Sequence, residues 1–571
     1  MMERPAGNRR VAELVERFTR AHFASHPEDA STLGVANHSE KLSSPSREAA
    51  LGDLAGLRAA LAEASSIEAE RASGDTELDL DAALDLDALC RAARFHARRI
   101  ESDVDAESLE MAALPNAALQ HAALHARSLA DLNGMIARAC AVPAYLEQQT
   151  ANLRRGVEDG RAADQEVAEA FVARLLPGAA RSIEALPSDV ARRLASLEDA
   201  AKGAALQRLA EATASASDAY RTMARAVSED ILPHGRRDVV LGPDEVAFRL
   251  RDVMGVETSI DTLLAGAEGR LARAHAEMVE HAAIAGWAVK GVADTKDALN
   301  ALFNDKARTI EEALAAYDRE LVAATRFSRE RAIVPIPDEL AIALEPLPDG
   351  IADGCGLTNW PAPLREPTGR GHALYSRDPN DHPKISAKQL AIHEGIPGHY
   401  LQSAVWQRSS SSPVRFFGVM DDVAIAAGYF GTMVSVEGWA VHMEDVMARE
   451  GFFDAGSERL FSAWCDAVRA TRVIMDLGLH ALGKSADEIT SRVAGATLLS
   501  EAWARQQVLR SKRSPLQSSS YLIGAMEIEA LETLARPKMS QLEFHRELLS
   551  FGPVPTSRLR SHFAPGAATP G

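Results

Sequence analysis

The 571-residue chain contains few cysteines, few aromatic residues and no long apolar run. Its four cysteines, Cys90, Cys140, Cys355 and Cys465, are far apart and form no C-x-x-C pair. This spacing excludes a zinc-knuckle pattern and gives little reason to expect a disulfide framework. No stretch approaches the roughly 20 apolar residues that a membrane-spanning helix needs. The opening "MMERPAGNRRVAELVERF" also lacks the hydrophobic core of a signal peptide. These absences predict a cytoplasmic protein with reduced thiols and no membrane partner.

Positive charge is also scarce. The chain has 62 lysines and arginines against 81 aspartates and glutamates, and its net charge is -19. A nucleic-acid surface requires clustered lysine and arginine, so no nucleic-acid partner is expected. The hydrophobic share of 46% is ordinary for a soluble globular protein. Composition leaves the substrate and the oligomeric state open.

Helix-forming residues are abundant. Alanine, leucine, glutamate and arginine dominate, and apolar residues recur at spacings of three and four. The pattern predicts a mainly α fold, a large multi-helix body with a few short strands. An opening helix is expected to stop at His26-Pro27, and further helices are expected at 162–176, 187–229, 258–286, 308–326, 413–449, 455–482 and 485–510.

One segment differs in character. Residues 331–384 contain "AIVPIPDEL", "PLPDG" and "NWPAPL" before the apolar run "HALYS", which predicts loops with two short strands. This segment is the predicted connection between an N-terminal helical portion at 1–330 and a C-terminal helical portion at 385–562. The end, at 563–571, is predicted to be a disordered tail.

The stretch "AIHEGIPGHYLQ" at 391–402 holds an unusual histidine pair. In the H-E-x-x-H pattern of zinc hydrolases the second histidine follows four positions after the first, but here Pro397 occupies that place and His399 comes two residues later. Residues six apart on a regular helix diverge by about 120°, too far to share a metal ion. Pro397 must break the helix, and Gly398 tolerates the detour. The prediction is a bulge that returns His393 and His399 to one face; the alternative is two polar residues at a kink.

A carboxylate ligand is expected from a second helix, "SVEGWAVHMEDVMARE" at 435–450. It carries Glu437 and Glu444, two turns apart on one face. Apolar neighbours indicate that Glu437 is buried, and a buried glutamate needs a cation, a proton or a donor. Glu437 is therefore a candidate metal ligand, with a structural ion pair as the alternative.

These motifs resemble a large bacterial family known as domain of unknown function 885, whose signature is HExxPGHxxQ followed by EGWA. The first motif stands at His393 to Gln402 and the second at Glu437 to Ala440. Two further pieces follow in the family's order, "ATRVIMDLGLHALG" at 470–483 and "RSKRSPLQSSSYLIG" at 510–524. The resemblance covers nearly the whole chain.

The resemblance implies a helical protein with a deep cleft, related to zinc peptidases of the gluzincin type. It implies one zinc ion held by His393, His399 and Glu437, with Glu394 as the general base toward water. The expected partner is a small peptide or amide substrate. Two alternatives remain, a specialised metal-dependent hydrolase or lyase acting on a metabolite and a non-catalytic helical binding protein stabilised by metal. Glu394 beside His393 argues against the latter, because a structural zinc site needs no base.

Amide hydrolysis also needs a donor for the developing oxyanion. His480, Arg510 and Tyr521 are candidates of the right chemical type. Each has an ordinary explanation: His480 could lie on a helix face, Arg510 could be exposed in the basic run "RSKR", and Tyr521 could belong to the core.

The chain departs from the family's pattern at four positions, with the metal-ligand motif intact. Tyr400 replaces a frequent histidine, His442 a usual tyrosine, Lys484 a common tryptophan and Gln507 a common glutamate. These departures bear on substrate preference and turnover.

Overall fold

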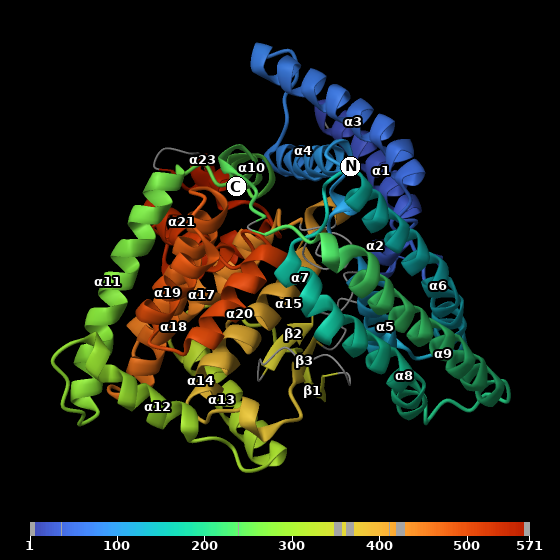
Figure 1. Ribbon diagram of the computed structural model, residues 1–571. Helices are drawn as coiled ribbons and strands as arrows, with labels where there is room; N and C mark the ends of the chain where they lie inside the picture. The colour runs from blue at the N-terminus through green and yellow to red at the C-terminus, as the bar shows by residue number, and fades with distance from the viewer. Residues whose placement is uncertain are drawn as a thin grey trace.

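The computed structural model describes residues 6–35, 37–237, 239–347, 357–360, 371–409, 412–417 and 429–564. Most of these residues lie in helices (Figure 1), which confirms the predicted mainly α fold. None of the helices in these ranges is long and apolar enough to span a bilayer. The predicted tail lies outside the described residues from position 565 onward, but Phe563, placed in that tail from the sequence, is buried at the end of the last helix.

The N-terminal helices form two groups. Helices α1, α3 and α4 pack together, and α5, α6, α8 and α9 build a separate hydrophobic core, seen on the right of Figure 1. The bounds in this region are α1 (Ala6–Ser25), α2 (Pro27–Thr32), α3 (Arg47–Ser73), α4 (Leu80–Glu101), α5 (Leu114–His125), α6 (Leu129–Glu158), α7 (Gln165–Ala170), α8 (Leu176–Arg193) and α9 (Lys202–Ala226).

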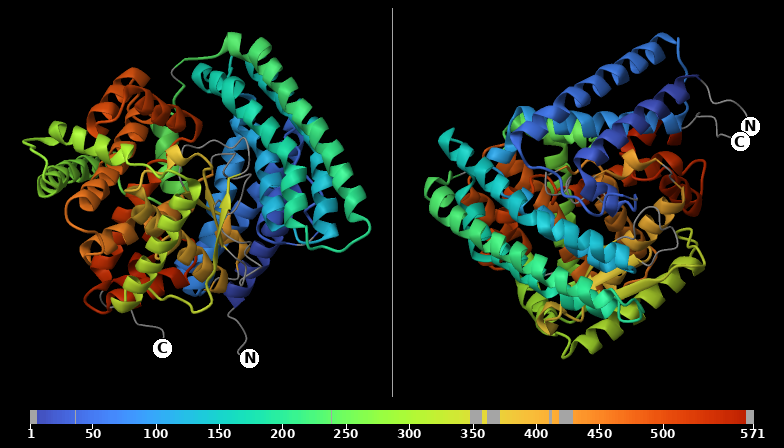
Figure 2. Two further views of the ribbon diagram at one scale, coloured as in Figure 1. Left: turned by 90° about the horizontal axis from the view of Figure 1, so that it is seen from below. Right: turned by 90° about the vertical axis from the view of Figure 1, so that its right-hand side faces the viewer.

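Four further helices lead to a small sheet: α10 (Pro243–Phe248), α11 (Ile260–Ile284), α12 (Lys296–Asn304) and α13 (Ile310–Glu330). In the described residues the sheet has three strands in the order β1 (Ile342–Pro346), β3 (Gly371–Tyr375), β2 (Leu357–Trp360). Strands β1 and β3 are parallel, with Ile342 opposite Gly371, and β2 is antiparallel to β3. Figures 1 and 2 show the sheet between the α5–α9 group and the C-terminal helices.

The C-terminal helices carry the two motifs. They are α14 (Ser386–Leu390), the π-helical turn η9 (Ala391–Gly395), α15 (His399–Ser409), α17 (Met433–Arg449), α18 (Ser457–His480), α19 (Ala486–Thr497), α20 (Glu501–Arg513), α21 (Ser520–Ala535), α22 (Gln541–Ser550) and α23 (Arg560–Phe563). Helix α18 packs along α11, and α17 packs along α21.

Hydrophobic cores cross the boundary predicted at residue 330. One core joins α1, α3 and α4 to α15, α17, α21 and α22, so that Phe18 and Leu89 share it with Trp439 and Phe544. A second joins α11 to α18 and α21. In the described residues, the buried residues of the α5–α9 core all come from the N-terminal portion, with Leu509 of α20 packed against them. The division at 330 therefore follows a change in composition rather than a break between cores.

Two predicted helices are interrupted. The helix expected at 187–229 is two helices: α8 ends at Arg193, and Lys202 at the start of α9 donates hydrogen bonds to the carbonyls of Leu194 (3.0 Å) and Leu197 (2.6 Å) in the connection. The helix expected at 485–510 breaks at Leu498, which has a positive φ of 61°, and restarts with Ser500 as the cap of α20. Of the helix expected at 413–449, the structure describes a 3-10 turn at Pro413–Phe416 and helix α17 from Met433, and residues 418–428 lie outside the described ranges.

Two glycines bring α17 and α21 into backbone contact. A Cβ atom added to Gly438 would collide with the backbone of Gly524, and one added to Gly524 would collide with the carbonyl oxygen of Val434. No side chain separates the helices at this crossing. Because Glu437 precedes Gly438 and Tyr521 lies one turn before Gly524, the crossing sets these two side chains next to each other.

Replacing Gly524 with alanine is therefore expected to lower the free energy of unfolding by about 1–3 kcal/mol, the usual cost of overpacking. Thermal unfolding of the variant measures this effect. Gly56→Ala is the matched control: Gly56 lies inside α3, no atom lies within 4 Å of its added Cβ, and alanine favours a helix over glycine by about 1 kcal/mol. An unfolding temperature for Gly524→Ala at or above that of the native protein would show that the crossing has room for a methyl group.

Candidate metal centre

The helix that carries His393 breaks between the two histidines, as the sequence predicted. Helix α14 continues into the π turn η9, which holds His393 and Glu394, and Ile396 then takes an extended conformation with φ -120° and ψ 125°. His399 is the first residue of the new helix α15. A side chain on Gly398 would collide with the carbonyl oxygen of His393, so this tight return requires glycine. The imidazole rings end up 4.7 Å apart, centroid to centroid.

Glu444 determines which nitrogen of His393 is free. Its Oε1 lies 2.6 Å from Nδ1 of His393, and a carboxylate can only accept, so Nδ1 carries the proton. Glu444 is held in turn by Arg469, whose Nη2 donates to Oε1 at 2.6 Å, and by Gln389. When the ring is neutral, Nε2 of His393 therefore presents a lone pair to the opposite side of the ring. Carboxylate support of this kind is typical of metal-binding histidines.

Gln402 orients His399 in the same way. The amide nitrogen of Gln402 donates to the carbonyl of Ser435 at 2.8 Å, which leaves its oxygen facing Nδ1 of His399 at 3.4 Å. Nδ1 of His399 is then the donor, and Nε2 has a free lone pair. Gln402 is the glutamine of the motif at 391–402, and these two contacts explain why the motif has a glutamine at this position.

The two free nitrogens meet Glu437. Its Oε2 lies 3.6 Å from Nε2 of His393 and 3.3 Å from Nε2 of His399, and one ligand atom from each residue lies within 4.8 Å of the others. Oε2 of Glu437 is buried and has no hydrogen-bond partner within the described ranges. In the metal-free protein a proton held by His393 offsets the carboxylate charge, and a bound divalent cation would take its place between the three atoms. The three residues thus fit a divalent metal ion.

The electrostatics of the site favour a cation. Burial alone would lower the pKa of His393, but Glu437 and Glu444 raise it to about 10. Burial would raise the pKa of Glu437, but the two imidazoles hold it well below its ordinary value. Positive charge is therefore strongly stabilised at the point where the three side chains converge.

Glu394 is buried directly beside the group of His393, His399 and Glu437, the metal-type cluster. It follows His393 in the π turn, has 8% of its surface exposed, and its charge contributes to raising the pKa of His393. The structure therefore brings together four of the residues predicted from the sequence: His393, Glu394, His399 and Glu437.

Tyr521 and Arg510 also reach this site. The Tyr521 ring stacks on the His393 ring with centroids 6.1 Å apart and an interplanar angle of 8°. Burial and the Glu437 carboxylate raise the pKa of Tyr521 to about 12, so the phenol keeps its proton at neutral pH. Burial alone would lower the pKa of Arg510, but the neighbouring Tyr521 and Glu437 raise it.

His480 is placed elsewhere. Its Nε2 lies 3.1 Å from the carbonyl oxygen of Ser511 and 3.2 Å from the Ser511 hydroxyl, at the far end of α18. Burial lowers the pKa of His480 to about 4, so the ring is neutral. Within the described ranges it makes no hydrogen bond or ring contact with the three ligand residues, and this placement does not support its predicted role as an oxyanion donor. Helix periodicity alone could not show which neighbour its ring faces.

Sequence reasoning missed several supporting residues. The sequence marks Glu444 only as a second carboxylate on the face of Glu437, and it gives no sign of a role for Arg469 or Gln389. Arg472 belongs to a sequence motif, and the structure places its guanidinium carbon 5.3 Å from the centre of the Tyr521 ring. The seven-residue spacing of Glu437 and Glu444 is the feature of the sequence that could have predicted the role of Glu444. It places both carboxylates on one face of α17, where each contacts a different ring nitrogen of His393.

The four departures from the family pattern have distinct surroundings. The Tyr400 hydroxyl donates to the carbonyl of Ala341 at 2.6 Å, next to β1. Nε2 of His442 lies 3.1 Å from Nε2 of His545 in the core, and Lys484 pairs with Glu488 on the surface at 2.8 Å. Gln507 differs from these three, because it accepts from the Nε and Nη2 atoms of Arg472, each at 3.2 Å.

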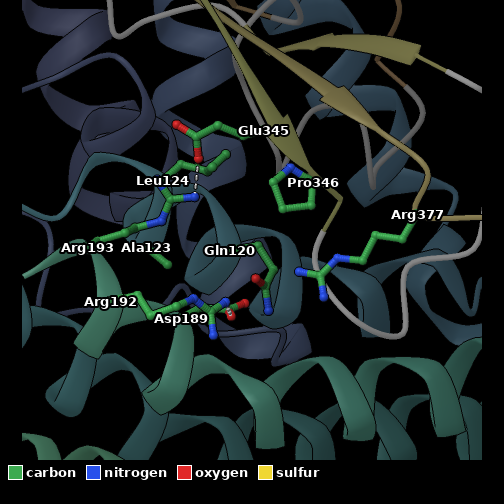
Figure 3. Close-up of a pocket in the computed structure, with 9 residues that line it drawn as sticks. All are labelled: Gln120, Ala123, Leu124, Asp189, Arg192, Arg193, Glu345, Pro346 and Arg377. Carbon is green, nitrogen blue, oxygen red and sulfur yellow. Dashed lines mark hydrogen bonds and ion pairs between the residues drawn. The ribbon is translucent and has the colours of Figure 1, made fainter. Parts of the chain in front are cut away.

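A cavity of about 260 Å³ lies apart from this centre, between α5, α8 and β1 (Figure 3). Two of its arginines are paired: Arg192 with Asp189 and Arg193 with Glu345. None of the residues that line it belongs to the predicted site. It is therefore not the cavity of the metal-type cluster.

The protein is mainly helical and has a buried His/His/Glu cluster, with both histidines on a broken helix and the glutamate on α17. A family model for bacterial proteins of unknown function (DUF885) matches residues 27–563, and the chain belongs to this family. The resemblance stated from the sequence motifs is thereby confirmed at the level of the family. No curated protein matches the chain.

Two solved structures share the fold. "The putative lipoprotein from Colwellia psychrerythraea" superposes with a TM-score of 0.79 at 17% identity, covering 98% of each chain. "A putative lipoprotein of unknown function from Shewanella oneidensis" superposes with a TM-score of 0.70 at 18% identity, covering 97% of this chain and 99% of the other. At this level of identity the likeness concerns the fold alone.

These descriptions contradict the cytoplasmic location predicted from the sequence. Both neighbours are described as lipoproteins, a class of protein that a covalently attached lipid holds at a membrane. The prediction rested on the lack of an apolar leader in the first residues, and such an absence does not determine a compartment. We withdraw it.

Proposed function

We propose that this protein is a zinc-dependent hydrolase that cleaves an amide or peptide bond of a small substrate. One observation carries the proposal: Nε2 of His393, Nε2 of His399 and Oε2 of Glu437 converge in the interior of the protein. Two histidines and a glutamate are a ligand set of catalytic zinc sites. When bound there, zinc would activate a water molecule and polarise the substrate carbonyl.

Glu394 supplies the base. Its buried carboxylate lies next to His393, so it accepts a proton from the attacking water and passes it to the leaving nitrogen. A structural zinc site is closed by four protein ligands, whereas three side chains converge in the described part of this chain. Three ligands and an adjacent base support catalysis over a purely structural role.

Tyr521 supplies the donor for the oxyanion. Its phenol keeps its proton and lies beside Glu437 at the crossing of α17 and α21, on a rigid helix. Arg510 lies next to Tyr521 and adds positive charge on the same side of the cluster. A neutral donor aimed at developing negative charge stabilises the tetrahedral intermediate more than the planar substrate.

The test is hydrolysis of a panel of short peptides and N-acyl amino acids by zinc-loaded protein, compared with the Tyr521→Phe variant. Native protein is expected to hold about one zinc per chain and to cleave part of the panel. Tyr521→Phe should lower kcat by about 100- to 1,000-fold, because one oxyanion donor is lost. Its zinc content and unfolding temperature should stay close to native values.

Absence of zinc from protein purified without chelators, or no cleavage across the panel by the loaded protein, would contradict the proposal. A Tyr521→Phe variant with native kcat but a much lower unfolding temperature would instead identify Tyr521 as a core residue.

A further inference from the structure

Two arginines beside the candidate metal centre have no carboxylate partner among the residues that the structure describes. Arg472 of α18 donates from Nε and Nη2 to the amide oxygen of Gln507, and Arg510 of α20 donates from Nη2 to the amide oxygen of Gln517 at 2.7 Å. Both partners are neutral. Within the described residues neither guanidinium takes part in an ion pair, although each is only partly exposed.

This arrangement is unusual beside the neighbouring residues. Arg469, one turn before Arg472 on α18, forms an ion pair with Glu444 at 2.6 Å. Charges removed from water are normally neutralised in this way, because desolvation is costly. Burial, and after it the nearby positive charge of Arg510, lower the pKa of Arg472 to about 10. The two cations therefore lie close to each other, near the Glu437 carboxylate, but in the described residues neither forms an ion pair with it.

The nearest carboxylates are already engaged. Glu437 belongs to the metal-type cluster. Asp476 is fully buried and accepts hydrogen bonds from the Ser511 hydroxyl and from the backbone nitrogen of Ser519 at 2.9 Å. Neither approaches the two arginines as an ion-pair partner.

We propose that Arg472 and Arg510 bind a carboxylate of the substrate, adjacent to the bond that is hydrolysed. Arg472 lies over the Tyr521 ring, and Tyr521 stacks on the metal-type ligand His393, so the bound anion is about one aromatic ring away from the reacting centre. The planar fork of a guanidinium matches a carboxylate with two parallel hydrogen bonds. The substrate class is then an amide whose amine component carries a carboxylate close to the scissile bond, such as the C-terminal residue of a peptide. Hydrolysis of this substrate rests on the proposed function, whereas binding of its carboxylate by the two arginines does not.

Gln507 keeps Arg472 available. Its amide oxygen orients the guanidinium through two hydrogen bonds without cancelling its charge. A glutamate of nearly the same shape would form an ion pair with Arg472 and compete with the substrate carboxylate. Gln507→Glu is therefore an isosteric probe of the site.

The experiment measures binding by isothermal titration calorimetry. The probes are N-acetylglycine and its neutral counterpart N-acetylglycinamide, and the protein carries Glu394→Gln so that neither probe is consumed. N-acetylglycine is expected to bind more tightly than the amide. Gln507→Glu should weaken its binding by about 10- to 100-fold, the usual effect of losing charge-assisted hydrogen bonds. Arg472→Met should have a similar effect.

Gln506→Glu is the matched control. It adds the same charge one position earlier on α20, where the exposed side chain contacts Arg174 instead, and it should change binding less than twofold. Equal binding of the two probes, or no effect of Gln507→Glu in a variant that unfolds at the native temperature, would overturn the proposal. Tighter binding of inorganic phosphate with the same dependence on residue 507 would overturn the carboxylate assignment.

Titrations with and without zinc separate this inference from the proposed function. Carboxylate binding that depends on residue 507 in a protein that takes up no zinc would leave the anion site standing and contradict the hydrolase. Normal zinc uptake without carboxylate binding would contradict the anion site alone. Binding that vanishes when zinc is removed would show that the carboxylate binds the metal, and would overturn the assignment to the arginines.

Discussion

Replacement of His399 by alanine is expected to abolish stoichiometric zinc binding while the helical fold persists. His399 provides one of three ligand atoms, and its Nε2 lies 3.3 Å from the buried Oε2 of Glu437. Its loss leaves two ligands for an ion that requires at least three from the protein. The loss of affinity should exceed the roughly 10- to 100-fold caused by removing a residue that only supports a ligand. Metal analysis after equilibrium dialysis measures it.

Two further variants calibrate this result. Glu444→Gln removes the carboxylate that orients His393 and should weaken zinc binding by about 10- to 100-fold, an intermediate effect. His442→Gln changes a buried histidine on the same helix as Glu437, whose ring contacts His545 instead, and should keep native zinc content. Zinc content of His399→Ala equal to that of His442→Gln would remove His399 from the ligand set.

Glu394→Gln is expected to retain zinc and to lose about 100- to 10,000-fold in kcat, the range attributed to a positioned general base. The glutamine amide occupies the same volume but cannot accept and return a proton. The buried position of Glu394 next to His393 makes it the carboxylate available for this task. Steady-state kinetics on any substrate found in the panel, with zinc content measured on the same samples, test the expectation.

The result separates a catalyst from a metal-stabilised binding protein. If Glu394→Gln hydrolysed a verified substrate at a rate near that of the native protein, the base would have to be another group. Glu394→Ala serves as a control for packing, because both variants lack the base and should show similar kcat if shape is unimportant. A much lower unfolding temperature for the alanine variant alone would identify a structural contribution of the side chain.

The sequence predicted the broken helix correctly because the cause is local. Pro397 has no N–H to donate, and the close approach of Gly398 to the His393 carbonyl tolerates no side chain. The mainly α class follows in the same way from residue propensities and spacing summed over many turns. Burial of Glu437 was visible in its apolar neighbours.

Other features depended on contacts between distant parts of the chain. The relative rotation of α18, α20 and α21 determines whether His480 faces the site or Ser511. It also determines that the neutral Gln507 is the hydrogen-bond partner of Arg472. Apolar spacing indicates which face of a helix is buried but not which polar side chain it meets there. The interruption near Leu498 also escaped sequence analysis, because leucine seldom takes a positive φ.

The sequence by itself determined the helical class, the break at Pro397 and the chemical types of the three candidate ligands, because each follows from properties of neighbouring residues. Only the tertiary structure decided which nitrogen of His393 is free, through Glu444 some 50 residues away in sequence, and which carboxylate meets it. The backbone contact between Gly438 and Gly524 then places Glu437 beside Tyr521. Such positions result from the packing of whole helices, which depends on the side chains of both contacting surfaces and not on neighbouring residues in the sequence.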